Sequence, residues 1–203
     1  MNTTETPAPA VRPMRADARQ NYARLLSAAA AAFAEHGPDA PLDEIARSAG
    51  VGIGTLYRHF PTRQALLEAV FLDSIQALGA GADALLDAPS PGEALDSWLH
   101  AVLAHNLSQR GLKEALMASG GSETAAACKA QMREAGAALL ARAQQAGAVR
   151  SDAEIGDVMR FVHAIALATD QASEGADRAE RLLSFMLDGL KAETGAPSGP
   201  TTP

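Results

Sequence analysis

Apolar residues recur along almost the whole chain with a period of about 3.6, and runs of β-branched residues are absent. Ala and Leu, which both favour helices, dominate the segments between the two ends. This pattern predicts an all-α protein. The predicted helices cover about residues 17–35, 42–49, 53–60, 63–86, 111–118, 122–146 and 176–193, and two more begin after Ser90 and Ser151.

Local signals mark the starts of several of these helices. Ser90 with Glu93, and Ser151 with Glu154, have the spacing of capping boxes. Thr62 precedes the long helix that starts at residue 63 and is a candidate N-cap. We therefore expect side-chain caps at all three helix starts.

The two ends of the chain differ in composition from the rest. Residues 1–13 contain three prolines and few large apolar residues, and residues 194–203 contain three prolines and two glycines. Both segments are predicted to be disordered tails. The pattern predicts that the chain between these tails is helical.

The charge of the chain is unevenly distributed. The 203 residues include 17 basic and 24 acidic ones, a net charge of −7, which argues against a protein that simply coats nucleic acid. Residues 1–65 hold 7 basic and 6 acidic residues, so the acidic excess lies in the remainder and two parts with different partners are expected.

Composition also bears on cellular context. A single cysteine, Cys128, excludes a disulfide scaffold and multi-cysteine metal sites. The start of the chain does not resemble a secretory signal, and no uninterrupted apolar stretch reaches the roughly 18 residues that span a bilayer. We therefore expect a cytoplasmic protein without a membrane partner.

Residues 41–60, PLDEIARSAGVGIGTLYRHF, are the most informative segment. They predict two short helices joined by a tight glycine turn, which is the helix-turn-helix arrangement. The outward face of the second helix then presents Thr55, Tyr57, Arg58 and His59. This face has no acidic residue and can donate hydrogen bonds to phosphates and base edges of DNA. Arg63, at the start of the next helix, is a further candidate phosphate contact.

Four short stretches stand in a fixed order and spacing along the first part of the chain. They read LLSAA at 25–29, FAEHG at 33–37, LDEIA at 42–46 and GTLYRHF at 54–60. In these stretches, and over about residues 18–78 as a whole, the chain closely resembles the tetracycline-repressor (TetR) family of bacterial regulators.

The resemblance implies a homodimer that binds palindromic operator DNA and usually represses transcription. It also implies a ligand cavity in the larger domain and dimerisation through the last two long helices. The expected architecture is therefore an N-terminal three-helix, helix-turn-helix DNA-binding domain over residues 17–63, followed by a larger C-terminal helical domain for ligand binding and dimerisation over residues 64–193.

The resemblance also assigns DNA contacts by position. The residues that it places at the DNA are Gly54, Thr55, Tyr57, Arg58, His59 and Arg63. Arg15 and Arg19, with Arg12, could add contacts from a flexible arm.

The chain departs from the usual family pattern at Pro41, Gly52 and Ile53, where a cap hydroxyl and a basic phosphate contact are missing. Fewer phosphate contacts predict weaker and less salt-sensitive DNA binding. A helical small-molecule-binding protein with weakened or lost DNA binding is therefore the alternative hypothesis.

The larger domain is expected to hold a small effector between its apolar stripes. The polar groups near those stripes are few: His100, His105, Asn106, His163 and Thr169. We therefore expect a largely apolar molecule held by one or two neutral hydrogen bonds, without a buried basic cluster for an anionic ligand. The candidate lining residues are Phe71, Trp98, Val102, His105, Met132, Met159 and His163, with Met117 and Phe161 as further members.

The last two helices have long apolar stripes, over residues 155–166 and 182–190. One chain cannot cover both faces of a two-helix hairpin, so a partner hairpin that completes a four-helix bundle is expected. The candidate interface residues are Met159, Val162, Leu183, Met186, Leu187 and Leu190.

Enzyme signatures are not found. The chain has no Gly-x-Ser-x-Gly elbow, no phosphate loop and no dinucleotide fingerprint, and its histidines lack metal-ligand spacing. No cofactor and no metal are expected, and a helical-bundle enzyme is the third hypothesis.

Overall fold

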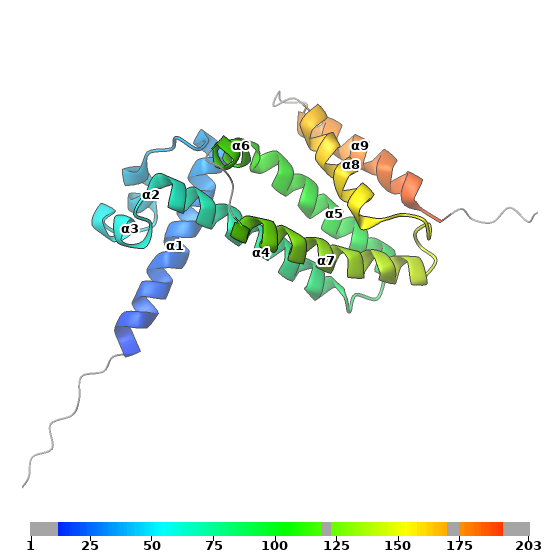
Figure 1. The fold of residues 1–203 in the computed structure, drawn as a ribbon, viewed down its shortest axis with the longest axis horizontal. Coiled ribbons are helices and arrows are strands. Elements are labelled where there is room, and N and C mark those ends of the chain that lie inside the picture. Colours follow the sequence, from blue (N-terminus) through cyan, green and yellow to red (C-terminus); the bar gives the residue numbers. More distant parts are fainter. Residues whose placement is uncertain (1–11, 119–122, 170–174, 193–203) are drawn as a thin grey trace, which may run out of the picture. The chain divides into compact units, whose positions relative to one another are not determined.

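The computed structural model describes residues 12–118, 123–169 and 175–192, and within these residues the regular elements are all α-helices. The all-α prediction is confirmed. Val149 and Lys191 form an isolated antiparallel bridge. The helices, in chain order, are α1 (Arg12–His36), α2 (Leu42–Ser48), α3 (Ile53–His59), α4 (Arg63–Leu85), α5 (Pro91–Ser108), α6 (Arg110–Ala118), α7 (Glu123–Gln145), α8 (Ile155–Ala168) and α9 (Gly175–Leu190) (Figure 1).

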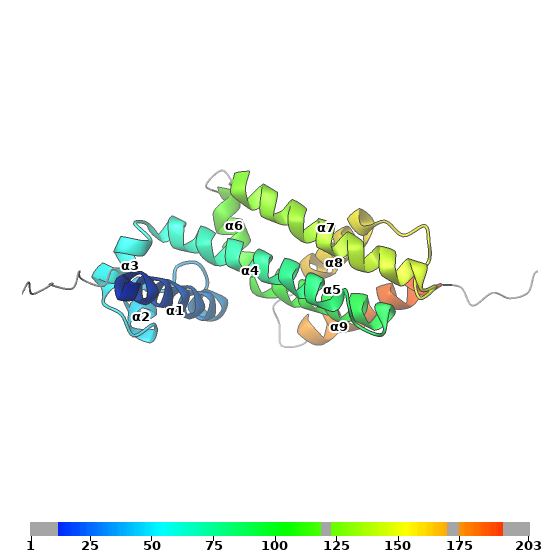
Figure 2. The same cartoon turned by 90° about the horizontal axis from the view of Figure 1, so that it is seen from below.

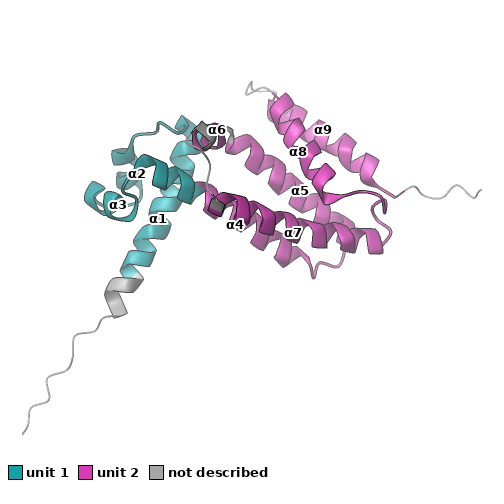
Figure 3. Ribbon diagram, viewed as in Figure 1, with its two compact units in different colours: residues 1–70 teal, residues 71–203 magenta. Residues whose placement is uncertain are grey.

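The chain divides into two compact units, residues 1–70 and 71–203 (Figure 3). The division falls within α4, which contributes residues to both units, whereas the expected boundary lay between residues 63 and 64. Helix α1 begins at Arg12, so the expectation of a tail up to residue 13 and a helix from residue 17 is wrong. Residues 1–11 and 193–203, which include the rest of both predicted tails, lie outside the described residues.

Unit 1 is built from α1, α2, α3 and the first part of α4. α2 packs against both α1 and α3, and Gly50 turns the chain between α2 and α3 with a φ of 69°, a conformation that glycine adopts without strain. Each large apolar side chain in its core contributes about 1.5–3 kcal/mol by leaving water. The buried residues include Leu25, Leu26, Ala29, Phe33, Ile45, Ala46, Ala49, Leu56 and Phe60.

Arg63 ties the start of α4 to the connection between α1 and α2. Its half-buried guanidinium donates hydrogen bonds from Nη1 to the carbonyl oxygens of Pro38 (3.0 Å) and Ala40. Thr62 caps the helix, because its Oγ1 accepts a hydrogen bond from the Ala65 N–H at 3.1 Å, as predicted. Arg63 therefore has a structural role that its position in the sequence did not indicate.

Helix α5 is the central helix of unit 2 and packs against α7, α8 and α9 (Figure 2). Trp98, in the middle of α5, donates a hydrogen bond from Nε1 to the carbonyl oxygen of Leu78 in α4 at 3.0 Å, and its ring lies against Gly136 in α7. A buried tryptophan whose N–H is satisfied thus connects three helices. The residues that α5 buries are Ala94, Leu95, Trp98, Leu99, Val102 and Leu103.

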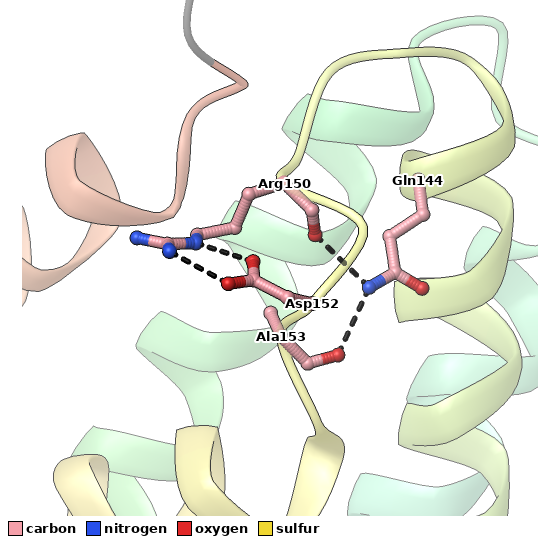
Figure 4. Close-up of polar contacts among 4 residues, drawn as sticks. All are labelled: Gln144, Arg150, Asp152 and Ala153. Atoms are coloured by element: carbon pink, nitrogen blue, oxygen red, sulfur yellow. Dashed lines mark hydrogen bonds and ion pairs between the residues drawn. The ribbon is translucent and has the colours of Figure 1, made fainter.

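Polar contacts hold the connection between α7 and α8 in place (Figure 4). Gln144 donates from Nε2 to the carbonyl oxygens of Arg150 (3.0 Å) and Ala153 (2.9 Å). Arg150 donates from Nε and Nη2 to the two carboxylate oxygens of Asp152, at 2.6 and 2.7 Å, and these bonds lower the pKa of Asp152. The Arg150 N–H donates to the Leu190 carbonyl at 2.9 Å, which anchors the end of α9.

The two predicted capping boxes do not form. α8 begins at Ile155 with Glu154 at the N-cap, and Gln144 binds the carbonyl oxygens of Arg150 and Ala153 in the segment that precedes it. Ser90 does occupy the N-cap position of α5, but its side chain makes no capping hydrogen bond.

Helix α4 is long and apolar enough to cross a membrane by length and composition alone, a test that core helices also pass. Its residues Leu66 and Val70 are buried in unit 1, and Phe71, Ile75 and Leu78 are buried in unit 2. We therefore interpret α4 as a core helix.

Replacing Gly136 by alanine should destabilise unit 2, because the added Cβ would overlap the Trp98 ring, which its hydrogen bond to Leu78 holds in place. Overpacking of this kind costs about 1–3 kcal/mol, and urea denaturation followed by tryptophan fluorescence measures it. In the matched control Gly81→Ala, the added Cβ meets nothing within 4 Å, so stability should stay unchanged or rise by up to about 1 kcal/mol. Equal effects of the two changes would contradict the packing of Trp98.

Arg63→Ala should lower the stability of unit 1 by about 1.5–3 kcal/mol, since two carbonyl oxygens lose a charged donor. The control is Arg47→Ala on α2, where the lost partner is an exposed ion pair with Asp43 at 3.4 Å, worth about 0.5 kcal/mol or less. Thermal denaturation followed by circular dichroism compares the two. If Arg63→Ala melts no earlier than Arg47→Ala, Arg63 does not hold the connection.

Candidate functional site

The outward face of α3 carries the side chains that the sequence pattern assigned to it. Tyr57 is 49% exposed and Arg58 is also exposed, while Thr55 is half-buried. Leu56 is fully buried on the other side of the helix, which determines the rotation of α3. Gly54 is exposed, and an added Cβ there would meet nothing within 4 Å. The face is therefore open, and it presents a hydroxyl, a phenol and a guanidinium.

His59 is half-buried because its ring packs against Tyr22 of α1, with ring centroids 5.9 Å apart at an angle of 66°. The Tyr22 ring also contacts Phe60, at 5.1 Å between centroids. These aromatic contacts join the end of α3 to α1 and hold the His59 imidazole in place.

The predicted basic contacts occupy positions that differ from those expected. Arg15 and Arg19 lie within α1 and not in a flexible arm, one helical turn apart. Arg19 is exposed, and the side chain of Arg15 lies outside the described side chains. Arg63, the candidate phosphate contact, is half-buried, and its guanidinium donates to the carbonyl oxygens of residues 38 and 40.

The positions that depart from the family pattern lie at the starts of α2 and α3. Pro41 is the N-cap of α2 and Gly52 the N-cap of α3, and neither helix has a side-chain cap hydrogen bond. Ile53, the first residue of α3, is exposed. The predicted loss of a cap hydroxyl is confirmed.

Unit 2 contains a cavity of about 200 Å³ whose lining comes from α4 to α8. The described lining residues are Phe71, Ile75, Leu78, Val102, His105, Asn106, Gln109, Lys113, Lys129, Met132, Met159 and His163. The predicted lining residues that the structure brings together here are Phe71, Val102, His105, Met132, Met159 and His163.

Other residues assigned to this cavity lie elsewhere. Trp98 is not among the lining residues, because its ring is inserted between α4 and α7. Phe161 is 62% exposed and lies about 200° around α8 from Met159, which does line the cavity. The side chain of Met117 lies outside the described side chains.

Two of the predicted polar groups also have partners elsewhere. His100 lies with Nδ1 2.8 Å from Oδ1 of Asp96 and with Nε2 3.3 Å from Oε2 of Glu180 in α9. Thr169 is buried, and its Oγ1 donates to the Ile165 carbonyl oxygen at 3.1 Å. Neither residue is among those that line the cavity.

We expected no buried basic cluster here, but two half-buried basic residues line the cavity. Lys113 of α6 and Lys129 of α7 both line it. The Lys113 ammonium donates to Nε2 of His163 at 3.2 Å, and Lys129 Nζ lies 5.1 Å from the centroid of the Phe71 ring. Burial, reinforced by both lysines, lowers the pKa of His105 to about 4, so this imidazole is neutral at neutral pH. Burial and the nearby Lys129 lower the pKa of Lys113 as well.

The sequence held a signal for one of these lysines. Lys129 lies three residues before Met132, a predicted lining residue, and so on the same face of α7. A search limited to apolar residues misses it, although the aliphatic stem of a lysine readily lies along apolar surface.

Large apolar side chains are exposed on the outer face of α8 and α9. Phe161 of α8 is 62% exposed and Phe185 of α9 is 70% exposed. Both line a groove of about 580 Å³ together with Leu182, Met186 and Gly189 of α9. We call this surface the α8–α9 face.

The predicted interface residues lie only partly on the α8–α9 face. Val162 and Leu183 are 0% exposed within the single chain, so neither side chain can contact a second copy, and Met159 lines the cavity. Met186 and Leu190 do line the groove. Leu187 is half-buried and packs against the core of unit 2. The apolar stripe seen in the sequence is therefore mostly the core-facing side of the hairpin.

Known proteins resemble both units of the chain. Residues 25–70 match the model of bacterial regulatory proteins of the tetR family, and residues 90–192 match the C-terminal domain of SbtR-like transcriptional regulators. The crystal structure of a TetR transcription regulatory protein from Mycobacterium vanbaalenii is 37% identical, with a TM-score of 0.73 over 89% of this chain and 100% of that chain.

Two relatives are uncharacterized HTH-type transcriptional regulators. Rv2250c from Mycobacterium tuberculosis is 28% identical over 179 residues, which are 84% of this chain and 89% of that protein. TtgW from Pseudomonas putida is 45% identical over 56 residues, and this match spans 27% of the chain and 42% of TtgW. Because the matches cover the helix-turn-helix unit and the larger helical unit, the chain belongs to the TetR family of DNA-binding transcriptional regulators.

Proposed function

We propose that this protein is a ligand-responsive repressor that acts in the cytoplasm as a homodimer at a palindromic operator. The observation that carries the proposal is the acid-free outward face of α3, from which Tyr57 and Arg58 extend while Leu56 holds the helix from its buried side. The relatives are named as transcriptional regulators, which supports a binding function for the cavity in place of a catalytic one.

Helix α3 is the proposed recognition helix. The Tyr57 ring offers apolar surface to thymine methyl groups and its hydroxyl can reach a phosphate, while Arg58 can donate to phosphate or to guanine. Thr55 and His59 add shorter donors, and the open space in front of Gly54 gives room for the DNA backbone. Arg15, Arg19 and Arg63 complete the proposed set, with Arg63 acting through the connection that it holds.

A second copy of the chain is the proposed partner of the α8–α9 face. The exposed rings of Phe161 and Phe185 and the groove beside Met186, with charged residues (Arg150, Asp152, Glu154 and Asp157) also in its lining, form a surface that a second, identical hairpin can cover around a twofold axis. The proposed product is a four-helix bundle, and the two half-sites of a palindromic operator for such a dimer are expected about 34–36 Å apart.

The cavity in unit 2 is the proposed effector site. Phe71, Ile75 and Leu78, which line it, belong to α4, the same helix that Arg63 begins. A ligand that binds better to one position of α4 than to another shifts the population of dimers competent for DNA. This shift is the proposed route from ligand to repression.

Tyr57→Ala should weaken binding to the operator by about 1–3 kcal/mol without lowering thermal stability, because the side chain is largely exposed. Tyr57→Phe removes only the hydroxyl and should keep the part of the affinity that the ring supplies. Fluorescence anisotropy with a labelled duplex from the chain's own upstream region measures both. The control is Tyr22→Phe on α1, which removes the same hydroxyl outside α3; equal losses for the two phenylalanine variants would contradict the assignment.

Phe185→Asp should convert the dimer into a monomer, because a carboxylate would be buried in an apolar interface. Light scattering at micromolar concentration measures the mass. Ile53→Asp is the matched control: it also places a carboxylate at an exposed apolar position, but on α3, and should remain dimeric. A wild-type monomer, or a dimer that survives Phe185→Asp, would overturn the proposed interface.

A ligand-binding protein with weak DNA affinity is the second candidate function. It is favoured by the missing side-chain caps at Pro41 and Gly52, which remove donors that commonly reach phosphate. It predicts that the wild-type protein leaves the operator duplex unbound at physiological salt and binds it only at low salt. The anisotropy titration of the wild type at both salt concentrations decides between the two functions.

A further inference from the structure

The cavity in unit 2 is divided by the chemistry of its lining. Along α7, Met132 is followed one turn closer to the N-terminus by Lys129, and along α5 the apolar Val102 is followed by His105 and Asn106. Phe71 lies at this polar end, with its ring centroid 6.3 Å from that of His105. The cavity thus has an apolar part and a polar part.

The polar part of the cavity contains two lysine side chains, and the described lining contains no carboxylate. Lys113 and Lys129 both line the cavity, none of its described lining residues is Asp or Glu, and within the described part of the chain neither ammonium forms an ion pair with a carboxylate. Their described contacts are with an imidazole, for Lys113, and with an aromatic ring, for Lys129. Both contacts orient the ammonium groups without neutralising them.

Two like charges near one cavity repel each other, and burial weakens their hydration. The lowered pKa values of Lys113 and His105 are consequences of this arrangement. A bound anion would remove the repulsion and supply acceptors for the ammonium groups, through charge-assisted hydrogen bonds that are stronger than neutral ones.

The remaining lining limits the size and character of such an anion. The cavity measures about 200 Å³, and a cavity of about 150 Å³ accepts a benzene ring. Ile75, Leu78, Val102 and the two methionines offer apolar contacts and no charge. One ring or a short hydrocarbon chain fits this part, whereas a highly charged metabolite would leave it without complementary contacts.

We propose that the effector of this protein is a small organic monocarboxylic acid, with its carboxylate between Lys113 and Lys129 and its hydrocarbon body against Met132 and Met159. The proposal rests on the proposed function of the cavity as an effector site and adds the chemical class of the ligand. Asn106 and Gln109 also line the cavity and supply amide groups that can hydrogen-bond the second carboxylate oxygen or a further polar substituent.

Isothermal titration of the full-length protein with benzoate and hexanoate tests the class, and benzyl alcohol, hexanol, benzylamine and inorganic phosphate serve as comparisons. Both acids should bind to the wild type, and the alcohols, the amine and phosphate should bind at least about tenfold more weakly, since they lack either the carboxylate or the hydrocarbon body. Thermal shift provides a second readout of the same binding.

Substitutions of the two cavity lysines test whether the acids bind in the cavity. Lys129→Gln and Lys113→Gln should each weaken benzoate binding by about tenfold or more, and Lys129→Arg should restore much of it by keeping the charge. Lys191→Gln is the matched control, because Lys191 is exposed and paired with Asp188 at 2.7 Å outside the cavity. It should bind benzoate like the wild type. Thermal melts of each variant without ligand identify any that fail to fold, and Lys113 and Lys129 provide two independent tests.

The proposal is overturned if neither acid binds, if the alcohols or phosphate bind as tightly as the acids, or if the glutamine variants bind benzoate like the wild type. Release of operator DNA, followed by anisotropy, separates this failure from failure of the proposed function. If neutral compounds release the DNA and the lysine variants respond as the wild type does, the effector site stands and the acid class is wrong. If benzoate binds through the lysines and the DNA stays bound, the acid class stands and the regulatory role of the cavity is wrong.

Discussion

Helix α5 has to bury side chains around much of its circumference, because α7, α8 and α9 all pack against it and Trp98 joins it to α4. The indole ring occupies the space that the missing side chain of Gly136 leaves on α7, and its N–H is satisfied by the Leu78 carbonyl. A large ring with one polar atom can be buried only if the neighbouring helix leaves space for the ring and its N–H finds an acceptor. The arrangement of unit 2 depends on this contact.

The cavity follows from the way the sequence of α5 changes along its length. Up to Leu103 the buried side chains are apolar and fill the core, whereas His105, Asn106 and Gln109 bring polar groups that cannot pack densely against hydrocarbon. Helices α6 and α7 place Lys113 and Lys129 beside them. Helix α8 contributes to two surfaces: Met159 lines this cavity and Phe161 lies on the α8–α9 face. The two residues are two positions apart, so their side chains point in nearly opposite directions.

Unit 1 contains two helices of only seven residues each, α2 and α3. A seven-residue helix such as α3 is not stable alone, so tertiary contacts must hold it. Leu56 supplies the buried anchor, the rings of Tyr22, His59 and Phe60 join α3 to α1, and Arg63 ties α4 to the connection before α2. Because these contacts lie behind and beside the helix, Tyr57 and Arg58 remain exposed on its outward face.

The sequence by itself determined the helical class, the helix-turn-helix and about half of the described cavity lining. These features depend on local information: the 3.6-residue period, the glycine turn at Gly50 and the alternation of Leu56 with its polar neighbours. The tertiary structure alone decided which way each apolar stripe faces and where long polar side chains end. Val162 and Phe161 are neighbours and equally apolar, yet one is buried and the other exposed, because the rotation of α8 depends on its packing against α5. Likewise, the residues around Arg63 do not indicate that it binds two carbonyl oxygens, and those around Lys113 do not indicate that it borders a cavity. Their partners lie 23 to 50 residues away along the chain.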